Sequence, residues 1–77
     1  MLLSDIQKGQ RVIITKVKTG DLRTKLMEMG CVPGTSLSLY FKAPLGDPLA
    51  FDINGYYLSM RKNEADNIEV EFDINDD

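Results

Sequence analysis

The sequence predicts a mainly β domain with one short helix, in which about five strands form a small barrel. Three observations lead to this prediction. Glycine and proline cluster at residues 30–34 and 43–48, apolar residues alternate with a period of two in several short segments, and only one segment has helical spacing. With 77 residues the chain forms a single domain. A domain of this size buries only roughly 60% of the surface of its unfolded chain, so it has no room for a large internal pocket.

The first 17 residues predict a helical turn followed by a strand. Ser4 and Gln7 have the S-x-x-Q spacing of a capping box, so we expect one helical turn that ends at Gly9. Residues 10–17 are rich in β-branched side chains that alternate between two faces. This segment is therefore the first predicted strand.

The one predicted helix covers residues 21–29, after a break at residues 19–21. Leu22, Leu26 and Met29 recur at i, i+4 and i+7, which places them on one face of a helix. Gly30 can adopt the left-handed conformation that ends a helix. Pro33-Gly34 fits the central positions of a type II turn.

Three further strands are predicted between residues 35 and 61. Residues 35–42 alternate with a period of two, and residues 43–48 separate this strand from the next because proline cannot donate to a sheet ladder. Asn54-Gly55 between residues 49–53 and 56–61 indicates a hairpin with a two-residue turn. Its register would pair Ile53 with Tyr56, Phe51 with Leu58 and Leu49 with Met60, and on the other face Asp52 with Tyr57 and Ala50 with Ser59.

The last part of the chain predicts a turn, a strand and a tail. Residues 62–66 form the turn, with Asn63 as a cap, residues 68–72 alternate as the fifth strand, and residues 73–77 form a frayed tail. No internal repeat or linker interrupts residues 1–77. Five short strands and one helix that share a single core favour an SH3-like or OB-like barrel.

The charges of the chain are unevenly distributed. Residues 1–42 contain seven basic and three acidic side chains, whereas residues 43–77 contain two basic and nine acidic ones. The first prediction from this asymmetry is that a basic first strand pairs with an acidic last strand in one sheet. The alternative is a dipolar surface that orients the protein on a partner or near an anionic membrane.

The residue inventory does not support catalysis, and we predict no catalytic or cofactor-binding residues. The chain has no histidine, which is the commonest general base, and its one cysteine, Cys31, lacks a second cysteine for a redox pair. We therefore expect Cys31 to pack beneath the turn. The serines at positions 4, 36, 38 and 59 have no base to activate them and are interpreted as caps and outward strand residues.

No metal site and no membrane span are predicted. Residues 73–77 copy the D-x-N-x-D opening of an EF-hand loop, but lack the glycine and glutamate that complete it. Loose binding of a hard cation by Glu69, Glu71 and Asp73 stays open. The longest apolar runs contain only a few residues, and the first residues do not resemble a secretion signal, so we expect a cytoplasmic protein.

Nucleic-acid binding is a weaker alternative. A domain with a net charge of −3 is poorly suited to phosphate binding. A local basic patch flanked by stacking tyrosines is still conceivable from the sequence. Its members would be Lys8, Arg11, Lys16, Lys18, Arg23 and Lys25, with Tyr40, Tyr56 or Tyr57.

Three segments together resemble the ferrous iron transport protein A (FeoA) family. They are a basic helix that ends in a G-x-x-P-G turn at residues 30–34, the sequence APLGDP at residues 43–48, and the strand GYYLSMR at residues 55–61. The resemblance implies an SH3-like barrel and a cytoplasmic accessory role in ferrous iron uptake, in which the chain acts on the cytosolic G-protein region of the membrane transporter FeoB. FeoA-like domains also occur in iron- or manganese-dependent repressors, which is the alternative function. Because the chain begins with its own methionine, we expect the free-standing form.

We predict that the helix, the turn and the second proline cluster form one apolar docking surface for the partner. Met27 lies roughly 100° from Leu26 on the helix and is hard to bury together with it, and Leu45 lies at the tip of a loop. The candidate partner-binding residues are Leu26, Met27, Cys31, Pro33, Pro44 and Leu45.

Overall fold

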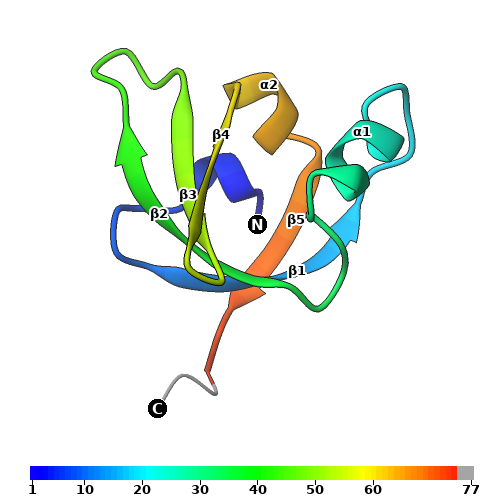
Figure 1. Cartoon of the computed structure of the whole chain (residues 1–77), viewed down its shortest axis with the longest axis horizontal. Helices are drawn as coiled ribbons and strands as arrows, with labels where there is room; N and C mark the ends of the chain where they lie inside the picture. Colours follow the sequence, from blue (N-terminus) through cyan, green and yellow to red (C-terminus); the bar gives the residue numbers. More distant parts are fainter. Residues whose placement is uncertain (75–77) are drawn as a thin grey trace.

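The computed structural model describes residues 1–74 and contains a curved, five-stranded antiparallel sheet with the order β4-β3-β2-β1-β5 (Figure 1). The strands are β1 (Arg11–Val17), β2 (Ser36–Lys42), β3 (Leu49–Ile53), β4 (Tyr56–Met60) and β5 (Ile68–Phe72). A 3₁₀ turn, η1 (Leu3–Asp5), and two short helices, α1 (Arg23–Glu28) and α2 (Lys62–Ala65), complete the fold. The predicted mainly β barrel of five strands is confirmed.

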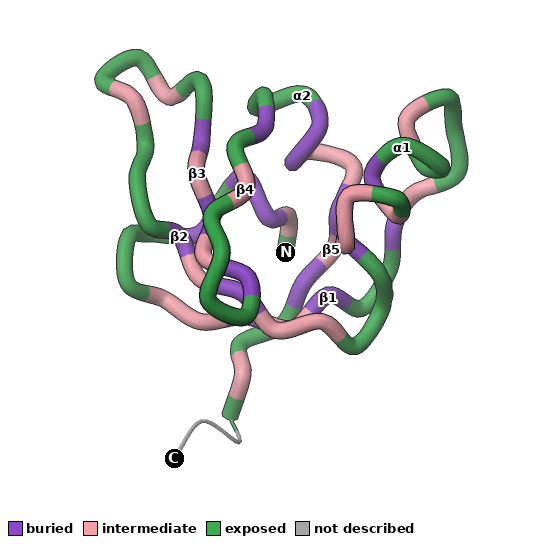
Figure 2. The backbone as a smooth tube through the Cα atoms, in the orientation of Figure 1, coloured by how far each residue is buried: buried purple, intermediate pink, exposed green. Residues whose placement is uncertain are grey.

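The core lies on the concave side of the sheet, where the inward-facing residues of all five strands meet (Figure 2). Alternation along β3 buries Leu49, Phe51 and Ile53 and leaves Ala50 and Asp52 partly exposed. The other buried apolar residues are Leu3, Ile6, Val12, Ile14, Val17, Leu26, Cys31, Leu37, Leu39, Met60, Ala65, Ile68 and Val70.

The hairpin between β3 and β4 has the predicted register. Asn54 and Gly55 both have positive φ values, 50° and 92°, as a two-residue turn of type I′ requires. Ile53 lies opposite Tyr56, and the remaining pairs follow from it. Local turn chemistry therefore fixes the placement of β4.

Helix α1 ends in a Schellman motif. The Cys31 N–H donates to the Leu26 carbonyl at 3.0 Å and the Gly30 N–H to the Met27 carbonyl at 3.1 Å, while Gly30 has a φ of 101°. The Thr35 N–H then closes the predicted turn on the Val32 carbonyl at 3.1 Å. The helix is shorter than the predicted residues 21–29, but its end and the turn after it are confirmed.

Three local predictions were wrong. Ser4 does not cap the first turn, because its side chain is buried and its hydroxyl donates to the Asp66 carboxylate. Most of the predicted turn at residues 62–66 is a second helix, α2 (Lys62–Ala65), so the chain has more than one helix. Asn63 lies inside this helix, and the Glu64 carboxylate accepts the Arg61 N–H at 2.8 Å at its start.

The basic first strand pairs with the acidic last strand, as the charge asymmetry predicts. Lys16 lies opposite Glu69 across the β1–β5 pair. Asp73, the residue directly after β5, is still hydrogen-bonded to the sheet. Its N–H donates to the Arg11 carbonyl at 3.1 Å, and its carboxylate accepts a hydrogen bond from the Ser36 hydroxyl at 3.0 Å. Residues 75–77, and with them most of the predicted tail and the EF-hand-like D-x-N-x-D pattern, lie outside the described residues.

Candidate partner-binding surface

Four of the six candidate residues lie at or just after α1, but two of them are inaccessible. Leu26 and Cys31 are completely buried in the core. Met27 is half-buried and packs against that core, and Pro33 is exposed in the turn. Leu26 and Cys31 can therefore shape this part of the surface from beneath but cannot contact a partner directly.

The other two candidates lie in the loop between β2 and β3. Pro44 is exposed, and Leu45 is 97% exposed at the loop tip. This loop and α1 stand at opposite ends of the long axis of the molecule (Figure 1). The structure therefore does not join the two groups into one continuous apolar patch.

A groove lies between the two groups. It has a volume of about 420 Å³, and α1 and the end of the β2–β3 loop contribute one wall residue each, Lys25 and Pro48. The end of β4 and α2 supply the remaining lining residues, which are Ser59, Met60, Arg61 and Glu64. None of these six residues was among the candidate partner-binding residues, and of the six only Lys25 belongs to another predicted site, the candidate basic patch. One signal in the sequence could have indicated α2. Glu64 follows Arg61 by three residues, which is the spacing of a capping box at the start of a helix.

Glu64 connects the two helices at the groove. Its Oε2 atom accepts a hydrogen bond from the Lys25 Nζ atom at 2.8 Å, although the Lys25 side chain is 61% exposed and the Glu64 side chain only 9%. The hydrogen bonds from Lys25 and from the Arg61 backbone lower the pKa of the Glu64 carboxyl below its ordinary value. Burial, assisted by the charge of Glu64, raises the pKa of the Cys31 thiol to about 11. Cys31 is therefore a protonated packing residue at neutral pH.

Acid is expected to destabilise the fold through α2. Folding lowers the pKa values of Glu64 and Asp66, and for Asp66 the main cause is the hydrogen bond from the Ser4 hydroxyl. Both carboxylates therefore stabilise the folded state at pH values above the pKa that each has in the unfolded chain. This stabilisation is lost as the pH falls through the lower pKa values of the folded state. Urea unfolding between about pH 6 and 2 should therefore give a falling free energy of unfolding, with on the order of 1 kcal/mol from Glu64.

The matched variants are Glu64→Gln and Glu28→Gln. Glu64→Gln should lower stability at neutral pH and flatten the acid dependence. Glu28 is exposed in the neighbouring helix, so Glu28→Gln should keep the slope of the parent chain. An acid slope that Glu64→Gln leaves intact would contradict the assigned role of this carboxylate.

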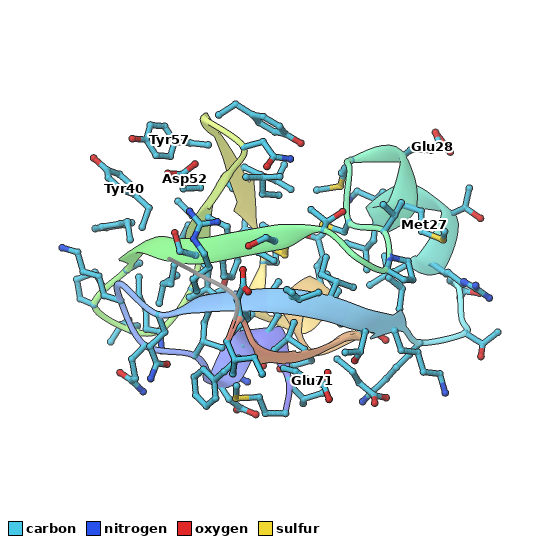
Figure 3. The ribbon with its side chains drawn as sticks, turned by 90° about the horizontal axis from the view of Figure 1, so that it is seen from below. Met27, Glu28, Tyr40, Asp52, Tyr57 and Glu71 are labelled. Atoms are coloured by element: carbon cyan, nitrogen blue, oxygen red, sulfur yellow. The ribbon has the colours of Figure 1, made fainter. Side chains whose placement is uncertain are left out.

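An exposed aromatic group covers the outer face of β2 and β4. The ring centroids of Tyr40 and Tyr57 lie 4.4 Å apart. Asp52 of β3 lies opposite Tyr57 in the strand pairing, and Figure 3 shows all three side chains at the same end of the molecule. Across residues 1–74 there is no group of three histidine, cysteine, aspartate or glutamate side chains that could hold a metal ion. In the same part of the chain, no helix is long and apolar enough to span a membrane.

The order and curvature of the sheet define a small SH3-like domain. FeoA from Stenotrophomonas maltophilia in complex with zinc, described as a prokaryotic SH3 domain protein, superimposes with a TM-score of 0.80 over 92% of this chain and 89% of its own, at 24% identity. The FeoA domain model matches residues 1–72, and the chain belongs to this family.

Two relatives share more of the sequence. The solution structure of FeoA from Chlorobium tepidum is 40% identical, with a TM-score of 0.86 over 100% of this chain and 74% of its own. A fusion of Fe(2+) transport protein A with the Fe(2+) transporter FeoB from Porphyromonas gingivalis is 38% identical over 72 residues. The match covers 92% of this chain but only 8% of the fusion protein.

Proposed function

We propose that this chain is a cytoplasmic accessory protein of ferrous iron uptake that binds the cytosolic part of FeoB. The fusion protein of Porphyromonas gingivalis is the observation that carries the proposal, because it joins a homologous domain to the transporter in one polypeptide. A tether keeps two linked parts at an effective concentration of roughly millimolar. A FeoA domain that is not tethered to FeoB lacks this high effective concentration, so it needs an interface that binds FeoB with sufficient affinity by itself.

The exposed apolar residues of the candidate set are the proposed contacts with FeoB. Leu45 and Pro44 project from the β2–β3 loop, the accessible part of Met27 belongs to α1, and Pro33 lies in the turn after it. Because these two contact points flank the groove, the proposed interface spans it rather than lying on one patch. In this proposal the chain regulates the transporter by binding and performs no catalysis.

Binding to the purified cytosolic part of FeoB, measured by isothermal titration calorimetry, tests the proposal. Leu45→Asp and Met27→Asp should each weaken binding by about tenfold or more, since a buried apolar anchor typically contributes over 1 kcal/mol. Glu71→Gln changes an exposed position at the lower edge of Figure 3, away from Met27, and should bind like the parent chain.

Two outcomes would contradict different parts of the proposal. If the parent chain does not bind FeoB, the proposed function is wrong. If the parent chain binds and both aspartate variants bind equally well with an intact fold, the function stands and the assigned contacts are wrong.

A further inference from the structure

The two edges of the sheet differ in how they are covered. At the β5 edge, the Val70 N–H donates to the Met1 carbonyl at 2.8 Å, the Met1 amino group donates to the Val70 carbonyl at 3.3 Å, and Leu2 bridges to Glu69. At the other edge, β4 pairs with β3 alone. Over residues 1–74, β4 is therefore the sheet edge without a covering segment.

The open edge of β4 presents backbone groups that can bind another strand. In an antiparallel hairpin closed by a two-residue turn, Ile53–Tyr56 and every second pair after it are hydrogen-bonded. The intervening residues, Tyr57 and Ser59, direct their N–H and C=O groups away from β3. Over residues 1–74, no turn, loop or cap forms a backbone hydrogen bond with any of these four groups, and both residues are exposed.

Strand β4 also lacks the features that normally protect an edge. Natural edge strands carry lysine, proline or a bulge that discourages pairing with another chain. β4 has the sequence Tyr-Tyr-Leu-Ser-Met, with no charge and no proline, and its pairing with β3 is regular. By contrast, β5 carries Glu69 and Glu71 and is covered as well. An uncharged, regular edge is typical of a strand that accepts a partner segment.

The groove lies directly beside the end of this edge. Ser59, Met60 and Arg61 line it from the β4 side, and Lys25 faces them from α1. Its lining carries two positive charges, Lys25 and Arg61, and one negative charge, Glu64. Glu64 Oε2 is paired with Lys25 Nζ, whereas Arg61 bonds to Glu64 only through its backbone N–H, so the net positive charge of the lining comes from the Arg61 guanidinium and favours an incoming carboxylate.

We propose that β4 and this groove bind an extended acidic segment of a partner protein by β-strand addition. The segment forms an antiparallel or parallel ladder with the backbone of Tyr57 and Ser59, and an acidic side chain lies between Lys25 and Arg61. Backbone hydrogen bonds then supply affinity, and the basic pair supplies selectivity. β4 itself carries no acidic side chain, so edge-to-edge pairing of two copies would place no carboxylate of β4 between Lys25 and Arg61, which favours an acidic peptide segment over a second copy of this chain.

Nuclear magnetic resonance titration of the ¹⁵N-labelled chain with a synthetic peptide tests the inference without FeoB. The probe is a seven-residue peptide of alternating threonine and valine with a central glutamate, and its control has lysine at the centre. The glutamate peptide should shift the amide signals of Tyr57 and Ser59 most, and should bind at least about threefold more tightly than the lysine peptide because the groove lining has a net positive charge.

Substitutions at Ser59 separate the backbone contribution from the side chain. Ser59→Pro removes an outward N–H while leaving the ladder with β3 intact, and should weaken binding about tenfold or more. Ser59→Ala keeps the N–H and should bind like the parent chain. Should Ser59→Pro fail to fold, Arg61→Gln serves as the second variant and should abolish the preference for glutamate over lysine.

Three results would overturn the inference. The first is a titration in which the amides of Tyr57 and Ser59 do not shift at millimolar peptide. The second is equal binding of the glutamate and lysine peptides. The third is a doubling of the molecular mass without peptide that Ser59→Pro abolishes, which would assign the edge to a second copy. Because no arm uses FeoB, these results are independent of the proposed function.

Discussion

Leu26→Ala is expected to lower the free energy of unfolding by about 2–5 kcal/mol, the usual cost of removing a buried leucine side chain. Leu26 is completely buried, and its carbonyl accepts the Cys31 N–H that ends α1. The substitution keeps this carbonyl but leaves a cavity beneath the helix and the turn that follows it. For a domain of this size, 2 kcal/mol corresponds to a fall in Tm of roughly 8–16 °C. Urea and thermal unfolding measure both quantities.

Leu45→Ala is the matched control for the same chemical change at an exposed position. With Leu45 almost fully exposed, its removal should change stability by less than about 0.5 kcal/mol. Comparable stability losses in the two variants would contradict the structure at α1. The two variants also separate two explanations of weaker FeoB binding. Weaker binding by Leu26→Ala would reflect a damaged fold, whereas weaker binding by Leu45→Ala would reflect a lost contact.

Gly30→Ala is expected to destabilise the fold by about 2 kcal/mol or more, through two separate effects. Its φ of 101° lies in the region that side chains with a Cβ atom rarely adopt. In addition, a Cβ atom at this position would lie 2.7 Å from the Tyr56 hydroxyl oxygen, which donates to the Met29 carbonyl at 3.3 Å. Urea unfolding of the variant measures the sum of strain and displaced contact.

Two further variants separate these effects. Gly34→Ala has a similar φ of 95° but no atom within 4 Å of the added Cβ, so it should show the backbone strain alone. Combining Gly30→Ala with Tyr56→Phe removes the close contact and should recover part of the loss in a double-mutant cycle. If Gly30→Ala costs no more than Gly34→Ala, the contact with Tyr56 contributes nothing.

The features predicted correctly from the sequence are those that depend on neighbouring residues. Asn54-Gly55 determines a turn type, and the turn determines which residues of β3 and β4 face each other. The glycine at position 30 likewise ends α1 where a left-handed residue is required. Both features depend on a few consecutive residues, so they can be predicted without knowledge of the rest of the chain.

The features predicted wrongly or missed depend on contacts between distant segments. Ser4 has the spacing of a cap, but the Asp66 carboxylate, 62 residues away, accepts its hydroxyl. α2 is only four residues long, and its Glu64 bonds to Lys25 of α1. The groove arises because α1, α2 and β4 converge, and no pattern along the chain indicates that convergence.

The hydrogen bonds of Met1 have a practical consequence for attaching other domains. Because the first residue forms part of the ladder beside β5, an attachment at the amino end starts from a structured sheet edge. The chain after β5 instead leaves the molecule on the side away from α2 and the β2–β3 loop (Figure 1). A label, a surface anchor or a covalent tether is therefore best joined directly after Ile74, where the described chain points away from α2 and the β2–β3 loop and the amino-terminal ladder is left intact.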